Sequence, residues 1–183
     1  MASQEQVIWD GSRPSEPRAA AVWDAAATVP DPEIPVIGID DLGILRGVEL
    51  DDAQPQRAVV VITPTYSGCP AMGQIAADVT TAVREIGFAE VEIRTVLHPA
   101  WTTDWMSDKG RAALEEYGIA PPSARQPDGP VDLAMPMLRT DAVRCPRCKS
   151  FDVKELSRFA STSCKALYQC RACAEPFDYF KVL

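Results

Sequence analysis

The pattern of apolar residues predicts a helix and two strands early in the chain. Residues 19–29 (AAAVWDAAATV) are alanine-rich and predict a short helix. The helix should end at the proline-rich segment 30–35, because proline disfavours a helical conformation at the residue before it. Residues 42–50 and 57–63 predict strands joined by a polar turn. The second is mostly β-branched, so we expect a central strand that is covered on both faces.

The most regular periodicity follows these strands. Residues 70–87 begin with proline, end with glycine and carry apolar side chains at helical spacing, which predicts a helix. Residues 91–97 alternate as a strand, so the strand–helix–strand order predicts a parallel pair with a right-handed crossover. Ser107 predicts the cap of a further helix over residues 108–117, which Gly118 should close.

Composition separates a second module from these elements. Residues 121–130 (PPSARQPDGP) have the composition of a linker. The predicted fold class is α+β: a small mixed sheet with flanking helices (a strand–strand–helix–strand core), followed by a C-terminal all-β zinc ribbon. The expected division is a flexible N-terminus at 1–18, an α+β domain at 19–120, a proline-rich linker at 121–140 and a four-cysteine ribbon at 141–183. Phe151 and Val153 carry the signals of a strand in this ribbon.

Charge is spread unevenly over the 183 residues, whose net charge is −8. Residues 1–140 carry 10 basic and 21 acidic side chains, whereas residues 141–183 carry 8 and 5. A small positive excess in an otherwise acidic chain predicts no nucleic-acid partner, because phosphate binding needs many Lys and Arg contacts. The sequence shows neither a secretory signal nor an apolar run of membrane-spanning length, so we expect a cytoplasmic protein without a membrane partner.

Four of the six cysteines form two C-x-x-C pairs separated by 21 residues. Each pair makes a tight turn that directs two sulfurs to one point, and two such turns provide the tetrahedral thiolate set that zinc prefers. We therefore expect one structural zinc per chain, bound by Cys145, Cys148, Cys170 and Cys173, with no open coordination position. Redox-active or disulfide pairs and an iron–sulfur cluster, as opposed to zinc, remain alternatives for the same thiols.

Two further cysteines stand outside these pairs. Cys164 precedes the second pair and is interpreted as a buried strand residue, a reactive thiol or an alternative cluster ligand. Cys69 lies between a predicted strand and a predicted helix, where the helix dipole would lower the pKa of its thiol and favour nucleophilic or metal-ligand chemistry. A buried structural cysteine is the alternative for Cys69.

Two segments could flank Cys69. Asp31 and Glu33 lie in the proline-rich turn, and residues 98–107 (HPAWTTDWMS) follow the third strand at an edge where α/β sheets commonly bind ligands. Ordinary loop packing or capping is an equally good interpretation of each segment. His98 is the only histidine and, before a proline, is expected to be a packed loop residue.

Several of these motifs resemble a known family. The segments DPEIPV (31–36), DLGI (41–44), TPTYSGCP (63–70) and WTTDWMS (101–107) are similar to the PaaD (PaaJ) family of phenylacetate-degradation proteins. The main domain of that family belongs to the metal–sulfur cluster biosynthesis family, and the ribbon, including FASTSCKALYQC (159–170), resembles its C-terminal extension. The resemblance covers about residues 19–183, with all motifs in order.

The resemblance implies an accessory or maturation factor for the multicomponent phenylacetyl-CoA epoxidase in aerobic phenylacetate catabolism. It implies help with iron–sulfur cluster assembly or delivery to the [2Fe–2S] reductase component, with iron–sulfur carrier proteins as further partners. The characteristic cysteine of the family falls on Cys69, and its acidic motif falls on Asp31 and Glu33. We therefore expect Cys69 to hold iron or a cluster transiently, or to attack a persulfide. Thr102, Thr103 and Asp104 are accessory candidates.

The residue content of the chain limits the possible functions independently of this resemblance. One histidine cannot supply the two Glu-x-x-His units of a di-iron site, and no G-x-G-x-x-G follows a strand, so we expect neither the oxygenase nor the reductase and no enzyme. Two alternatives remain: a stable non-catalytic subunit of the epoxidase, and a thiol enzyme or hydrolase using Cys69, which lacks an evident base. A homodimer is also open, because exposed edge strands can pair between chains.

Overall fold

The computed structural model describes residues 9–122 and 143–182, and the chain divides into two compact units, residues 1–101 and 102–183. Each unit is considered by itself. The division lies before the last helix, whereas the first domain was expected to extend to residue 120. Most of the predicted linker at 121–140 lies outside the described residues.

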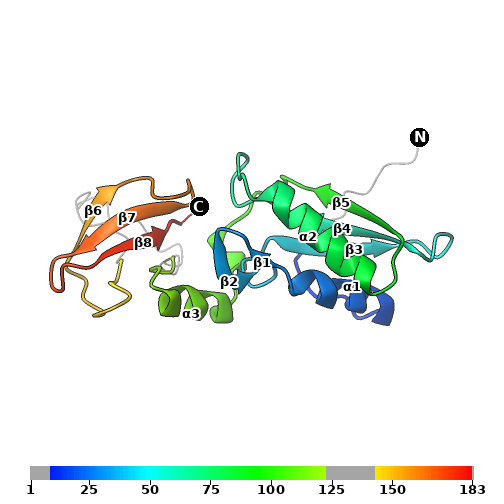
Figure 1. The fold of residues 1–183 in the computed structure, drawn as a ribbon, viewed down its shortest axis with the longest axis horizontal. Coiled ribbons are helices and arrows are strands. Elements are labelled where there is room, and N and C mark those ends of the chain that lie inside the picture. The colour runs from blue at the N-terminus through cyan, green and yellow to red at the C-terminus, as the bar shows by residue number, and fades with distance from the viewer. Residues whose placement is uncertain (1–8, 123–142, 183) are drawn as a thin grey trace, which may run out of the picture. The chain divides into compact units, whose positions relative to one another are not determined.

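The first unit is built on a three-stranded sheet of order β3–β4–β5, comprising β3 (Leu45–Leu50), β4 (Arg57–Ile62) and β5 (Glu90–Thr95). β3 and β4 pair antiparallel and β4 and β5 pair parallel, which confirms the predicted mixed sheet. α1 (Pro17–Ala27) packs against β3 and β4, and α2 (Met72–Glu85) packs against β5 and α1 (Figure 1). β4 is therefore central, as its β-branched residues predict.

The helices begin and end for identifiable reasons. The side chain of Glu16 accepts hydrogen bonds from the first backbone N–H groups of α1, and Gly87, with φ of +102°, follows the end of α2. α2 begins at Met72, so the prediction that Pro70 occupies its first helical position is wrong. The buried side chains of α2 are Ile75, Val79 and Val83, which recur at helical spacing and therefore lie on one face.

A short ladder precedes the sheet. β1 (Pro30–Asp31) pairs antiparallel with β2 (Ile34–Gly38), so the proline-rich turn closes a miniature hairpin. The side chain of Ile34 is buried, and Ile37 and Ile39 are buried beside it. The proline-rich turn was expected here, but its strand pairing was not.

Residues 9–16 belong to the N-terminus that the sequence analysis expected to be flexible, yet they make specific contacts. A Cβ atom on Gly47 would overlap the indole ring of Trp9, so this indole lies directly against β3. The buried Arg46 guanidinium donates to the Trp9 carbonyl (2.8 Å), and Arg13 forms a bidentate ion pair with Asp24 of α1. These contacts join the N-terminal segment to both β3 and α1.

The second unit contains a helical part and the ribbon. The 3₁₀ turn η1 (Thr103–Trp105) leads to α3 (Asp108–Tyr117), whose Ser107 cap and left-handed Gly118 are confirmed. The ribbon is an antiparallel sheet of order β6–β7–β8, with β6 (Val153–Ser157), β7 (Lys165–Cys170) and β8 (Pro176–Phe180) (Figure 1).

α3 is joined to the ribbon through the chain that follows it. Ala120 forms a parallel bridge with Tyr179, in which the Phe180 N–H donates to the Ala120 carbonyl (2.9 Å). Lys149 also forms an ion pair with Glu115 of α3 (2.6 Å). These contacts explain why α3 groups with the ribbon and not with the first unit. None of the helices in the described ranges combines the length and apolarity that crossing a bilayer requires.

Candidate metal centre and the separate cysteine

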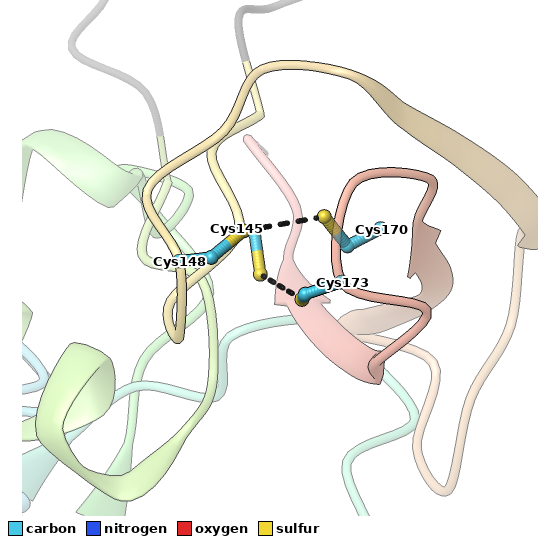
Figure 2. Close-up of side chains that lie close together, drawn as sticks. All are labelled: Cys145, Cys148, Cys170 and Cys173. Atoms are coloured by element: carbon cyan, nitrogen blue, oxygen red, sulfur yellow. Dashed lines mark hydrogen bonds between the residues drawn. The ribbon is translucent and has the colours of Figure 1, made fainter.

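The four cysteines of the two C-x-x-C pairs come together in the ribbon. Figure 2 shows their side chains converging from two loops, and all four sulfurs lie within 4.8 Å of one another. Two sulfur–sulfur contacts join the two loops: Cys145 to Cys173 at 3.8 Å and Cys148 to Cys170 at 3.4 Å. In the described residues, no other set of three or more His, Cys, Asp or Glu side chains is positioned to hold a metal ion.

The two loops, here called knuckles, have the same backbone construction. In the first, the Cys145 N–H donates to the Ser150 carbonyl, and in the second, the Cys170 N–H donates to the Glu175 carbonyl. Each knuckle has a left-handed residue four positions after its first cysteine, Lys149 (φ 64°) and Ala174 (φ 62°). Positive φ is uncommon outside glycine, so both turns are held by their surroundings.

The site lies at the boundary between core and solvent. Cys145 and Cys170, the first cysteine of each knuckle, are fully buried, whereas Cys148 and Cys173 are exposed. The buried pair forms part of the ribbon core with small apolar and aromatic side chains, namely Ala120, Val143, Ala166, Phe177 and Tyr179. Formation of the ribbon core therefore also fixes the positions of two of the four sulfurs.

An ion pair that sequence reasoning missed links the two knuckles. Arg147, between the first two cysteines, pairs with Glu175, just after the second knuckle. The hydrogen bond with Glu175 is the largest cause that raises the pKa of Arg147, and the charges of Glu175 and of the neighbouring thiolates add to it. Only the folded turns bring these two positions together, so no local pattern could have indicated the pair.

The thiols influence one another's ionisation in the metal-free ribbon. Burial opposes ionisation of Cys170, but hydrogen bonds from the Cys173 backbone N–H and from Cys148 outweigh it and lower the pKa of Cys170 to about 7. The Ser150 backbone N–H favours the Cys148 thiolate, yet the hydrogen bond with Cys170, together with burial, raises the pKa of Cys148 to about 12. The Glu175 backbone N–H likewise favours the Cys173 thiolate, but burial and hydrogen bonds with Cys170 and Cys145 raise the pKa of Cys173.

The donor set fits a tetrahedral zinc ion. Zinc–sulfur bonds of about 2.3 Å place tetrahedral sulfurs about 3.8 Å apart. This equals the 3.8 Å separation of Cys145 and Cys173, and the 3.4 Å separation of Cys148 and Cys170 is slightly shorter. Four thiolate ligands leave no position for a reacting water, so zinc bound here would supply folding stability and no Lewis-acid chemistry. Cys145, Cys148, Cys170 and Cys173 would hold it.

Cys69 lies in the other unit, in the turn between β4 and α2. Its side chain is partly exposed, and Ser67, Gly68 and Pro70 around it are exposed. Its backbone N–H donates to the Tyr66 carbonyl (3.1 Å), which closes the turn ahead of the helix. Because α2 starts at Met72, Cys69 precedes the helix and does not begin it. The thiol is not enclosed in the apolar core, so the reactivity predicted for it stays open to test.

The acidic motif has a structural use. Asp31 is buried, and its Oδ1 accepts hydrogen bonds from the backbone N–H groups of Glu33 and Ile34, both at 2.9 Å. This Asx turn fixes the bend between β1 and β2. Glu33 is exposed. Among the described residues, Asp31, Glu33 and Cys69 do not belong to a group of three or more candidate metal ligands.

The remaining candidates also have local structural contacts. Thr102 caps η1 by accepting from the Asp104 N–H (3.3 Å), while Thr103 is buried and its carbonyl accepts from Arg111 (2.6 Å). Cys164 lies in the turn before β7, partly buried, with its sulfur 3.1 Å from the Thr162 hydroxyl. It is outside the four-cysteine group, and it precedes the strand in which it was expected.

Comparison with protein families assigns a different family to each part of the chain. Residues 19–94 match the iron–sulfur cluster assembly protein family, which covers β1 through β5 almost entirely. Residues 134–181 match the PaaD zinc beta ribbon domain, which contains both knuckles. The first match includes Cys69, and the second includes the four clustered cysteines.

Individual proteins extend these matches. The chain is 38% identical over 83 residues to the Fe-S protein maturation auxiliary factor SufT of Staphylococcus aureus, covering 44% of this chain and 92% of that protein. A domain of unknown function, DUF59, from Bacillus anthracis is 31% identical, with a TM-score of 0.49 and coverage of 54% of this chain and 92% of that one.

A longer match spans both parts. The chain is 43% identical over 167 residues to a subunit of the putative 1,2-phenylacetyl-CoA epoxidase of Escherichia coli. The aligned region covers 91% of this chain and 94% of that protein, including the assembly region and the ribbon in the same order. Since so much of both sequences aligns, and the ribbon matches a domain defined for PaaD, this chain belongs to the PaaD family of phenylacetyl-CoA epoxidase subunits.

Proposed function

We propose that this chain is an accessory factor for a phenylacetyl-CoA epoxidase and assists the assembly or delivery of an iron–sulfur cluster to the reductase component. One observation carries the proposal: a single chain joins an iron–sulfur assembly region, with a partly exposed cysteine, to a PaaD ribbon. The names of the E. coli and S. aureus relatives, an epoxidase subunit and a maturation factor, support the two halves of this role.

Cys69 is the residue proposed to meet the iron or cluster. Its turn is exposed on both sides of the thiol, and α2 begins without a side-chain cap, which leaves its first N–H groups to favour a thiolate or another anion nearby. Binding iron would exchange the thiol proton for a metal–sulfur bond, and release would reverse the exchange without electron transfer. In the bound state, a partner protein would supply the remaining ligands of the iron.

The ribbon is proposed to hold one zinc permanently through its four clustered cysteines. This zinc would stabilise a surface for protein partners and take no part in transfer. The closed thiolate set supports a structural role for the ribbon metal, because a site without an open position cannot exchange its metal quickly.

The direct test replaces Cys69 with serine. When the reductase component is co-expressed with the Cys69→Ser protein, the iron and acid-labile sulfide of the reductase should be several-fold lower than with the unmodified chain. The zinc content of the variant should stay at one per chain. Cys164→Ser is the matched control, because Cys164 is also a partly buried cysteine outside the four-cysteine group. Unchanged cluster loading with Cys69→Ser would remove Cys69 from the mechanism.

A second function is a stable, non-catalytic subunit of the epoxidase. It is favoured by the same ribbon, whose described metal group is suited to structure alone. This function predicts co-purification with the other components at fixed stoichiometry and epoxidase activity that tolerates Cys69→Ser. The serine variant therefore separates the two functions.

A further inference from the structure

Exposed apolar side chains concentrate on one short segment of the ribbon. Residues 151–159, which run through β6, contain Phe151 (64% exposed), Leu156 (47%) and Phe159 (63%). Large apolar groups that stand in solvent cost free energy unless a partner covers them. The pairing register shifts between Glu155 and Ser157, so Leu156 lies in a bulge of β6.

The strand that carries these side chains is an edge strand. β6 pairs with β7, and no other described strand lies beside it (Figure 1). At the opposite edge of the same sheet, Ala120 bridges to Tyr179 of β8. The two edges therefore differ, because only β6 presents an edge without a described bridging residue. Backbone groups along such an edge can accept an additional strand.

Cations accompany the exposed rings. The guanidinium of Arg144 lies 5.9 Å from the ring centroid of Phe151, and the ammonium of Lys181 lies 4.6 Å from that of Phe159. Lys154 is exposed within β6 itself. Each end of the strand thus has an aromatic ring under a positive charge, with a third positive charge between them.

These three cations differ from the others of the ribbon. Arg147, Lys149, Arg158, Lys165 and Arg171 each lie within ion-pair distance of a carboxylate. Within residues 9–122 and 143–182, no ion pair is found for Arg144, Lys154 or Lys181. Uncompensated positive charge is therefore concentrated along β6, where the apolar side chains are also exposed.

We propose that the β6 edge binds an extended, acidic segment of a partner protein by strand addition. Backbone hydrogen bonds to β6 would align the segment, apolar side chains would cover Phe151 and Phe159, and carboxylates would pair with the nearby cations. This inference rests on the proposed function for the identity of the partner, which is a component of the epoxidase. A nucleic acid is disfavoured, because three cations on a chain of net charge −8 give little phosphate affinity.

The experiment uses the full-length, zinc-loaded chain mixed with purified epoxidase components. Hydrogen–deuterium exchange should slow at β6 in the complex, and carbodiimide should cross-link Lys154 or Lys181 to carboxylates of the partner. The double variant Phe151→Ser/Phe159→Ser should weaken binding about tenfold or more. The double variant Lys154→Glu/Lys181→Glu should also weaken binding, and the loss of affinity should be larger at low salt than at high salt.

Two variants serve as matched controls. Leu97→Ser removes an apolar side chain of similar exposure (62%) from the first unit, and Arg84→Glu reverses an exposed charge on α2. Neither should change binding by more than about twofold, given the small effect of most residues outside the contact. Zinc content and the exchange pattern of each unbound variant confirm that it is folded.

The outcomes separate this inference from the proposed function. A complex that forms without slowed exchange at β6 and binds the double variant normally overturns the inference and leaves the proposed function standing. Failure of every component to bind contradicts both. Cross-links that join two copies of this chain, or displacement of the partner by a single-stranded oligonucleotide that occupies β6, also overturn the inference.

Discussion

The two units of this chain obtain their stability from different sources. The first unit buries a conventional core of Ile, Val and Leu side chains between a three-stranded sheet and two helices, with β4 buried from Ala58 to Ile62. The core cluster of the ribbon has seven buried residues, and two of them are the cysteines Cys145 and Cys170. Because thiols take the place of hydrocarbon side chains in its core, the stability of the ribbon depends on the metal that those thiols bind.

The two units also use cysteine differently. The ribbon converges four sulfurs from two rigid knuckles, which fixes a complete ligand set. Cys69 stands in a partly exposed turn and does not belong to the group of metal-ligand side chains found in the described residues. A complete thiolate set favours retention of a metal, whereas an incomplete one favours exchange with a partner. Perturbing one unit at a time should therefore give different results, and the largest difference is expected when zinc is removed.

Removal of zinc should unfold the ribbon and spare the first unit. The metal is expected to contribute about 10 kcal/mol or more to a module of this type. Chelation, or Cys170→Ser, should therefore abolish the chemical-shift dispersion of β6–β8 in an NMR spectrum while the resonances of β3–β5 remain unchanged. A ribbon that stays dispersed without metal would contradict this dependence.

The matched change in the first unit is Ile75→Ala, which removes a fully buried side chain of α2. It should destabilise the first unit by about 2–5 kcal/mol, as large-to-small core changes do, and leave zinc content at one per chain. Loss of zinc in this variant would show that the two units do not fold independently.

The affinity for zinc should fall steeply as pH falls. Zinc displaces protons from thiols whose metal-free pKa lies above the solution pH, so protons compete with zinc more strongly as the pH falls. Cys148, with a pKa of about 12, and Cys173, whose pKa is also raised, are both protonated near neutrality. These two protons alone give about a 100-fold loss of affinity per pH unit, with a steeper loss below pH 7 as Cys170 protonates.

Competition titrations with a chromophoric chelator between pH 6 and pH 8 would measure this slope. The first unit, which holds no such thiol set in its described part, should keep its unfolding free energy nearly constant over the same interval. A pH-independent zinc affinity would mean that the thiols are already ionised before the metal binds.

Two substitutions of Asp31 can separate a structural role of its side chain from a role of its carboxylate in cluster transfer. Asp31→Ala leaves two backbone N–H groups without their acceptor and should cost about 1–3 kcal/mol in urea unfolding. Asp31→Asn retains an oxygen acceptor and should cost less than about 1 kcal/mol. If the asparagine variant is stable but fails to load the reductase, the carboxylate also acts in transfer.

Thr63 should give the smallest effect. Its hydroxyl is buried at the start of the turn that carries Cys69, with no hydrogen-bond partner in the described residues. Thr63→Val removes this unsatisfied group at nearly constant shape and should leave stability unchanged or raise it by about 1 kcal/mol. A large destabilisation would instead reveal a partner for the hydroxyl.

Local sequence chemistry predicted the elements whose ends carry strong signals. The Ser107 cap and Gly118 defined α3 to the residue, and the alternation of residues 91–97 identified β5. The spacing of the four cysteines located their cluster, because each C-x-x-C turn is formed by residues next to one another. The start of α2 was misplaced because Ala71 at its cap offers no side-chain signal.

Features that depend on distant contacts were not predictable in this way. Trp9 lies outside the helices and strands and packs against Gly47 of β3, which is far from it in the sequence. The grouping of α3 with the ribbon arises from the Ala120–Tyr179 bridge, across the segment of chain that composition identified as a linker. Phe151, which was expected in a strand, instead precedes β6 and is exposed.

The bridge at Ala120 has a consequence for assembly. A three-stranded sheet with two available sides could recruit one strand after another and grow into a polymer. Here one side is already occupied by the chain's own backbone, so any recruitment ends after a single step. If a partner strand adds at β6 as proposed, the ribbon should therefore bind one such strand per copy.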